Sequence, residues 1–293
     1  MTMNQSVTVT GRSGYQRRQR IVSIISFVLL LALSLVIALP FLWMLTTSLK
    51  PDVKAVLRLP PQWIPNPPTF QNYVIAWQEG RFARYTLNTV WISVSSVVLQ
   101  VITACLAAYV FARMKIPGKN ALFLLFLAVM MIPSQVTVVP IYIILSRLNW
   151  LDSFKGLIIP FAASAFGTFL IRQSFMSVPE DLVDAAIMDG ANHLRILWDV
   201  LIPLSRPAIV TFSLLTFNWR WNSYFWVLIM TNSNEMRTLP VGIVFLKEGA
   251  EGGSNWHILM AGTVLVLLPV LVVFIAAQRY FVEGVAHTGL KGV

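Results

Sequence analysis

The chain has one polar, acidic segment between long apolar runs, which reads SVPEDLVDAAIMDGANHLRILWDVLIP at residues 177–203. Ser177 and Glu180 have the spacing of a capping box, so a helix is predicted to begin here. Gly190 is a typical C-terminal stop for a helix, and Asn192 can cap a second helix. We therefore expect a helix-turn-helix hairpin outside the bilayer, closed by Pro203. Four apolar residues at helical spacing are expected to form one ridge for another protein: Leu194, Leu197, Trp198 and Leu201.

The composition around this hairpin is that of a membrane protein. The chain has 293 residues, of which 57% are hydrophobic and 12% charged, whereas soluble domains have about 25% charged residues. Repeated apolar runs predict an all-α polytopic membrane protein. In such a protein a net charge of +10 indicates cytoplasmic loops and anionic lipid headgroups rather than nucleic acid. The single Cys105 cannot form an intrachain disulfide and is expected to be buried.

Six apolar segments are long enough to cross a bilayer as helices: 21–46, 85–112, 121–145, 156–175, 205–230 and 257–281. Pro133 and Pro140 interrupt the third of them. The prolines of the stretch 48–82 predict an extended, water-exposed connection. Four parts are expected: a basic tail (1–20), the first span with a periplasmic linker (21–84), a core containing the hairpin (85–282) and a C-terminal tail (283–293).

Basic residues set the expected orientation. Four arginines precede the first span: Arg12, Arg17, Arg18 and Arg20. Arg113, Lys115 and Lys119 fill the turn between the second and third spans. Under the positive-inside rule both termini lie in the cytoplasm, and with six spans the hairpin does too. The expected location is the bacterial inner membrane.

Motifs for chemistry are missing from the sequence. There is no phosphate-cradling G-x-x-x-x-G-K-[ST], no H-E-x-x-H and no cysteine pair. His193, His257 and His287 are scattered, so neither an enzyme nor a metal site is expected. Uphill transport would need an ion gradient or a partner. A secondary transporter is the alternative, but it would need intramembrane carboxylates, and the six predicted spans contain no Asp or Glu.

The fifth span contains the candidate substrate pathway. A charge at the centre of a membrane helix costs about 2.5–3.5 kcal/mol and usually faces a cavity or a partner. Asn218, Arg220 and Asn222 are therefore the candidates for contact with substrate. If Arg220 faces the pathway, an anionic sugar is favoured, either a uronate oligosaccharide such as alginate or a sugar phosphate. Arg220 could equally reach a lipid phosphate or a carboxylate on a partner.

The hairpin also carries a family resemblance. Asp184-Ala185-Ala186, Asp189-Gly190-Ala191 and Ile202-Pro203 resemble the conserved loop of permease subunits in binding-protein-dependent ABC importers. Ala107-Ala108-Tyr109, Phe111-Ala112-Arg113 and Trp221-Asn222 are similar to the sugar-importer branch, nearest to the smaller, six-helix maltose-type permease. The resemblance runs from about Phe41 to the C-terminus. Asp184 replaces the usual Glu, and Val227 stands where a proline is common.

The resemblance implies a set of partners: a second permease, two cytoplasmic ATPases that use ATP and Mg, and an extracytoplasmic solute-binding protein. This chain would bind no cofactor itself. Its hairpin would be the helix that docks on an ATPase, through Asp184, Ala185, Ala186, Asp189, Gly190, Ala191 and Pro203. The loop 231–256 would contact the binding protein, with Asn232, Asn234 and Glu235 as candidates.

Overall fold

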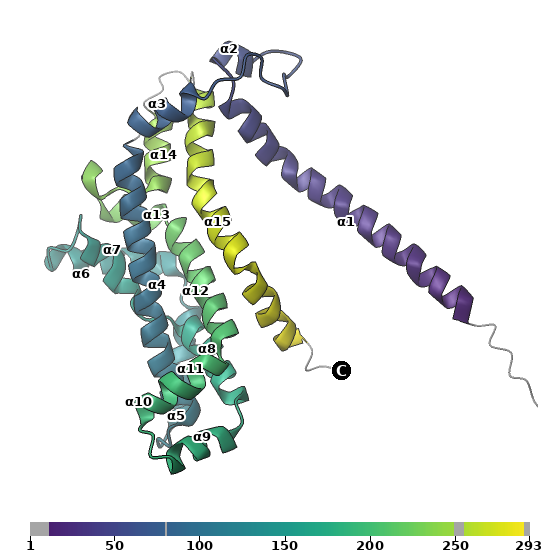
Figure 1. Ribbon diagram of the computed structural model, residues 1–293. Helices are drawn as coiled ribbons and strands as arrows, with labels where there is room; N and C mark the ends of the chain where they lie inside the picture. The colour runs from purple at the N-terminus through teal and green to yellow at the C-terminus, as the bar shows by residue number, and fades with distance from the viewer. Residues whose placement is uncertain (1–11, 80, 249–254, 290–293) are drawn as a thin grey trace, which may run out of the picture.

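The protein is a bundle of helices, several of them broken. The computed structural model describes residues 12–79, 81–248 and 255–289, and no strand occurs within these ranges (Figure 1). Three helices are long and apolar enough to cross a membrane: α1 (Arg12–Ser48), α4 (Phe82–Arg113) and α15 (Trp256–Gly289). The all-α membrane fold is therefore confirmed.

The two ends of the chain form more helix than the sequence predicts. Helix α1 begins at Arg12, inside the predicted tail, because arginine is a good helix former and the apolar span continues the helix. It contacts α15 at one end and leaves the bundle at the other (Figure 1). Helix α15 continues to Gly289, past the predicted boundary at 283. Residues 290–293 of the predicted tail lie outside the described residues.

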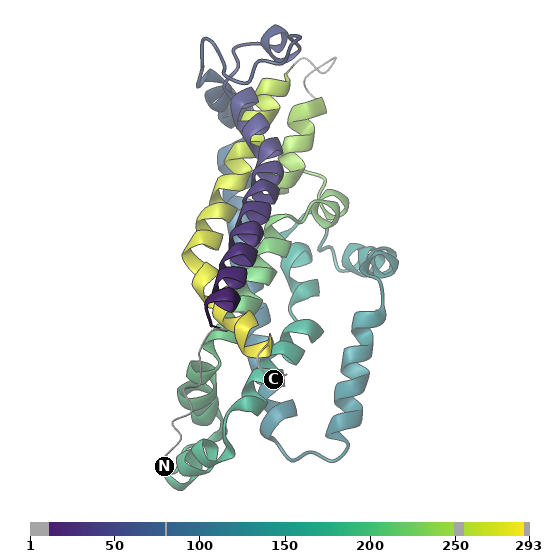
Figure 2. The same cartoon turned by 90° about the vertical axis from the view of Figure 1, so that its right-hand side faces the viewer.

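Two further predicted spans are bent pairs of helices. The third consists of α5 (Lys119–Ala128), η1 (Val129–Met131) and α6 (Ser134–Arg147), with a bend of 95° (Figure 2). The fourth consists of α7 (Phe154–Ile158), η2 (Ile159–Phe161) and α8 (Ala165–Ser177), with a bend of 44°. Pro133 lies at the first break as predicted, whereas Pro140 lies inside α6. With a third bent pair at His193–Leu204 and Arg206–Trp221, up to six spans are possible.

The fifth span is not the continuous helix that was predicted. It comprises α12 (Arg206–Trp221) and α13 (Phe225–Met230). Asn222 ends α12, since its side-chain amide donates to the Asn218 carbonyl at 2.9 Å and its own N–H bonds the same carbonyl. A side chain that takes a backbone acceptor competes with continuation of the helix.

The two outer connections also contain helices that the sequence analysis missed. The linker holds α2 (Val53–Val56) and α3 (Gln71–Glu79), and α3 packs on α15. Buried Asn72 donates to the carbonyls of Ser48 and Lys50, both at 2.8 Å. The second connection holds η4 (Asn234–Met236) and α14 (Leu239–Glu248). Prolines and polar residues suggested open loops, but tertiary contacts order these segments.

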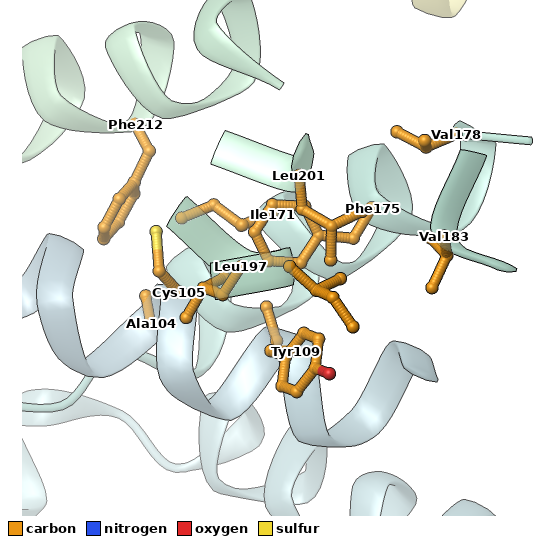
Figure 3. Packing of buried hydrophobic residues seen from close by; sticks show 12 residues of the cluster. Ala104, Cys105, Tyr109, Ile171, Phe175, Val178, Val183, Leu197, Leu201 and Phe212 are labelled. Atoms are coloured by element: carbon orange, nitrogen blue, oxygen red, sulfur yellow. The ribbon is translucent and has the colours of Figure 1, made fainter. Parts of the chain in front are cut away.

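The largest buried cluster lies where α4 and α8 meet the hairpin. Helix α4 packs along α8 and α12. This cluster contains Ala104, Cys105, Ala108, Tyr109, Ile171, Phe175, Val178, Val183, Ile196, Leu197, Leu201 and Phe212 (Figure 3). Cys105 is buried as expected. The hairpin is therefore part of the core and not a detached loop.

Candidate functional site

The first half of the hairpin is α9 (Glu180–Met188), which ends at Gly190. Gly190 has φ +80°, a left-handed conformation that favours glycine. The Ala191 N–H donates to the Ala186 carbonyl and the Gly190 N–H to the Ile187 carbonyl, both at 2.9 Å. These two bonds form a Schellman motif, so the predicted stop at Gly190 is confirmed.

The predicted capping box is wrong. Pro179 occupies the N-cap position and forms no side-chain cap. The Ser177 hydroxyl instead donates to the Ser174 carbonyl at 2.7 Å. Helix α8 extends to Ser177, so the serine hydroxyl bonds backward within that helix and cannot cap α9.

The second half begins as predicted and then departs from the α-helix. The Asn192 side-chain oxygen accepts from the Arg195 N–H at 2.9 Å. After α10 (His193–Arg195) the chain forms a π-helical segment, η3 (Ile196–Leu201), and then α11 (Ile202–Leu204). Pro203 lies within α11, one residue before this helix ends at Leu204, which agrees with the predicted end to within one residue.

The expected single ridge divides into two faces. Leu197 and Leu201 are buried at 1% and 0% exposure, whereas Leu194 and Trp198 are 59% and 58% exposed. The π-helical segment changes the spacing, so the four side chains do not share a face. Figure 3 shows Val183, Leu197 and Leu201 among the buried side chains. The hairpin also exposes five apolar residues: Leu182, Ile187, Met188, Leu194 and Trp198.

The predicted ATPase-coupling residues lie on both faces. Asp184, Ala185, Asp189 and Gly190 are exposed. Three are half-buried: Ala186, Ala191 and Pro203. Ala186 and Ala191 pack against the large buried cluster. Small side chains here let the hairpin lie close to its own subunit.

Three side chains that attach the hairpin were not predicted as site residues. The Tyr109 hydroxyl and His193 Nδ1 are 2.7 Å apart. Arg113 Nη2 donates to the Phe175 carbonyl at 2.6 Å and the Val178 carbonyl at 2.5 Å. A fourth side chain joins α8 to α4 beside the hairpin, since Arg172 Nε donates to the Phe111 carbonyl at 3.2 Å. The spacing of Tyr109 and Arg113, one helical turn apart at the inner end of α4, is the sequence signal that could have identified them.

The candidate pathway residues occupy two faces of α12. Asn218 and Asn222 are exposed, and the Asn222 amide donates to Asn218 Oδ1 at 3.0 Å. Arg220 instead points toward η2, with its Cζ 3.7 Å from the centroid of the Phe161 ring. Its Nε is buried and has no hydrogen-bond partner among the described residues. The arginine therefore retains hydrogen-bonding capacity in the apolar part of the protein.

The outer loop (residues 231–238) is held from two sides. The N–H groups of Asn232 and Ser233 donate to Asp152 Oδ1, both at 3.1 Å. Burial tends to raise the pKa of Asp152, but these bonds and the charge of Arg237 outweigh it, and the pKa is lowered. The predicted contact residues Asn232, Asn234 and Glu235 are all exposed.

The other side of the outer loop is bound to α4. Asn88 Nδ2 donates to the carbonyls of Glu235 and Arg237 at 2.7 and 2.8 Å. Arg84 Nε donates to the Glu235 carbonyl at 3.1 Å, and Arg81 pairs with the Glu235 carboxylate at 3.6 Å.

No cluster of three metal-ligating side chains occurs within the described ranges.

Comparison with known families identifies the arrangement. Residues 100–287, more than half of the chain, match the model of the binding-protein-dependent transport system inner membrane component. The chain belongs to this family. It is a multi-pass inner-membrane permease and a transport component rather than an enzyme.

Relatives place this permease in the sugar branch of ABC importers. The sn-glycerol-3-phosphate permease UgpE of Yersinia pestis is 33% identical over 243 residues, covering 81% of this chain and 86% of that protein. The arabinooligosaccharide permease AraQ of Halalkalibacterium halodurans is 32% identical, with coverage of 78% and 81%. A solved bacterial ABC transporter that imports the acidic polysaccharide alginate matches with a TM-score of 0.78, 28% identity and coverage of 96% and 100%.

Proposed function

We propose that this permease is one membrane subunit of an ATP-driven importer that moves an oligosaccharide into the cytoplasm by alternating access. Its partners are a second permease, two cytoplasmic ATPases and an extracytoplasmic binding protein. The ATPases bind and hydrolyse ATP with Mg, and the closure of these subunits is transmitted through the hairpin. Rocking of helices around a central site is how such transporters alternate.

The two-faced hairpin carries this proposal. Its inner face is buried in the core, while Met188 is 86% exposed and Trp198 58% exposed on the outer face. Exposed apolar side chains grouped on one surface indicate a protein interface. Glu180, Asp181 and Asp184 add exposed negative charge at the start of α9. Such a face suits an ATPase cleft with apolar and basic side chains.

The arrangement of the chain ends supports a cytoplasmic hairpin. The hairpin, the start of α1 and the end of α15 extend toward the same end of the bundle (Figure 1). The arginines in the first turns of α1 and the basic residues of the α4–α5 turn favour a cytoplasmic location for this end by the positive-inside rule. The outer loop then faces the binding protein, with Asn232, Asn234 and Glu235 exposed toward it.

We further propose that the substrate is an anionic sugar, either a uronate oligosaccharide such as alginate or a sugar phosphate. Arg220 forms no ion pair with the residues that the structure describes, and a membrane arginine needs a counter-charge. A carboxylate or phosphate on the substrate can supply it. The exposed Asn218 amide can donate to a sugar hydroxyl, and Asn222 Oδ1 can accept from one, because the Asn222 amide nitrogen already donates to Asn218. Trp219, 54% exposed on the same helix, can stack on a ring.

The test compares an acidic sugar with a neutral one in proteoliposomes that contain the complete transporter. Arg220→Gln is expected to lower uptake of alginate oligosaccharide by about tenfold or more relative to arabino-oligosaccharide, as expected for one lost charged hydrogen bond. Arg220→Lys keeps the charge and should retain most of this preference. Equal losses for the two sugars would remove the anionic-substrate proposal but not the importer.

A further inference from the structure

The hairpin and the outer loop are attached to opposite ends of one helix. Figure 1 shows α4 extending from α3 and α14 at one end to α10 and α11 at the other. It has 32 residues, which corresponds to a length of about 48 Å. Two surfaces that face different partners are therefore joined by one continuous element.

The attachment at the outer end consists of hydrogen bonds to backbone carbonyls. Asn88 is only 2% exposed, and its amide donates to the carbonyls of both Glu235 and Arg237. Buried Thr89 adds a third bond, since its hydroxyl accepts from the Leu239 N–H at 2.9 Å at the start of α14. These bonds fix both the end of the outer loop and the following helix to α4.

The attachment at the inner end includes hydrogen bonds as well, in addition to the apolar packing of the hairpin. Arg113 donates to the carbonyls of Phe175 and Val178, which lie at the end of α8 where the chain enters the hairpin. Tyr109, one turn earlier, bonds His193 at the start of the hairpin's second half. The helix therefore holds the hairpin at its entry and in its second half.

The helix between these ends lacks the features that bend its neighbours. Helices α1 and α15 each contain a proline, Pro40 and Pro269, whereas the sequence of α4 contains neither proline nor glycine. The remaining candidate spans in the described ranges are bent by 44° to 95°. Helices bend most readily at prolines and at breaks in their hydrogen bonding. We therefore expect α4 to transmit a displacement along its axis better than its neighbours do.

We propose that α4 is a strut that couples the binding-protein surface to the ATPase surface, with Asn88 and Arg113 as the positioning residues at its two ends. A displacement of the outer loop by a bound partner moves α4, and α4 moves the hairpin through Arg113 and Tyr109. This inference rests on the proposed function, since it assigns a route to the signal that the two partners exchange.

A double-mutant cycle on the complete transporter tests the strut. The quantity is the ratio of ATP hydrolysis with and without binding protein loaded with alginate oligosaccharide, or with arabino-oligosaccharide as a second probe. Asn88→Ala and Arg113→Gln are each expected to lower this ratio about fivefold or more, while unstimulated hydrolysis and co-purification of the ATPases persist. Because both residues act on one route, the ratio in the double variant should be about as low as in the more strongly affected single variant, and the two losses should not multiply.

Two controls keep the outcome decisive. Arg147→Gln changes an exposed arginine at the end of α6 and should leave the ratio unchanged. If a buried substitution prevents assembly, the milder pair Arg84→Gln and Tyr109→Phe is judged by the same criterion. An unchanged ratio in the single variants, or multiplied losses in the double variant, would refute the strut. A wild-type complex without stimulation would refute the importer proposal itself.

Discussion

The hairpin and the outer loop are both polar connections between apolar helices, yet they are held differently. The hairpin is packed by apolar side chains such as Val183, Leu197 and Leu201, and leaves an apolar outer face exposed. The outer loop is held by hydrogen bonds from Asn88 and to Asp152. The hairpin therefore combines a buried, packed side with exposed apolar residues, whereas the loop depends on hydrogen bonds to its own backbone.

The largest expected effect is at the turn of the hairpin. Gly190→Asp should abolish transport and weaken co-purification of the ATPase, while the chain still inserts into the membrane. A side chain at a left-handed φ costs roughly 1–2 kcal/mol, and an Asp here also adds charge to the docking face. Nothing lies within 4 Å of a Cβ added at Gly190, so a steric clash inside the protein would not explain the loss of transport. We expect that loss to come from the strained backbone and from weakened docking of the ATPase.

Gly118 offers a matched control for this variant. It has φ +72°, and nothing lies within 4 Å of an added Cβ, but it is in the α4–α5 turn. Gly118→Asp should keep the ATPase bound and retain transport. If both variants lose transport and ATPase binding equally, backbone strain alone explains the effect and the docking role of Gly190 is wrong.

An intermediate effect separates the two faces of the hairpin. Leu197→Ala removes a buried side chain and should lower the free energy of unfolding by about 2–5 kcal/mol. Leu194→Ala, at an exposed position in the same element, should change it by no more than about 0.5 kcal/mol but weaken ATPase binding. Denaturant titration in detergent and co-purification measure the two quantities. Similar unfolding energies for both variants would contradict the two-faced arrangement.

The smallest expected effect is at the outer loop. Asp152→Asn should lower the free energy of unfolding at pH 7 by about 0.5–1 kcal/mol, since its charged acceptor is partly solvent-exposed and screened. The folded pKa of Asp152 is lowered, so the carboxylate stabilises the fold above the unfolded value near about 3.9 and this contribution is lost as pH falls through the folded pKa. The difference between wild type and variant should therefore disappear in strong acid.

Asp199→Asn provides a matched control for the removal of a carboxylate. Asp199 is an exposed hairpin carboxylate that pairs with Arg195 at 3.6 Å, and exposed pairs stabilise little. At pH 7 the free energy of unfolding of this variant should differ from that of wild type by no more than about 0.5 kcal/mol. A pH-independent loss in Asp152→Asn would mean that its geometry, and not its charge, holds the loop.

The sequence predicted the parts that follow from local patterns. The length of the apolar run predicted the bounds of α4 to within three residues at each end. Gly190 and Asn192 correctly predicted the turn of the hairpin and the N-cap of its second helix. Each of these depends on residues close in the chain, so no knowledge of the tertiary fold was needed. The family resemblance, supported by the hairpin spacing, was confirmed by comparison with known proteins.

Tertiary contacts decided what the sequence could not predict. The break at Asn222 depends on where one side-chain amide bonds, and the π-helical segment at 196–201 depends on the packing of Leu197 and Leu201. Helix α14 was missed because its neighbours are polar, although Gly242 lies against the Tyr85 ring and lets the helix approach α4. The strut itself combines residues about 60 to 150 positions apart, which no local pattern brings together.

ATP-dependent uptake is the most direct test of the central claim. The chain is reconstituted in liposomes alone, and in parallel with its partner permease, ATPases and binding protein. We predict uptake of sugar only in the complete system and only with ATP and Mg inside the compartment where the hairpin lies. Uptake by the chain alone without ATP, driven by an ion gradient, would contradict the account and support a secondary transporter.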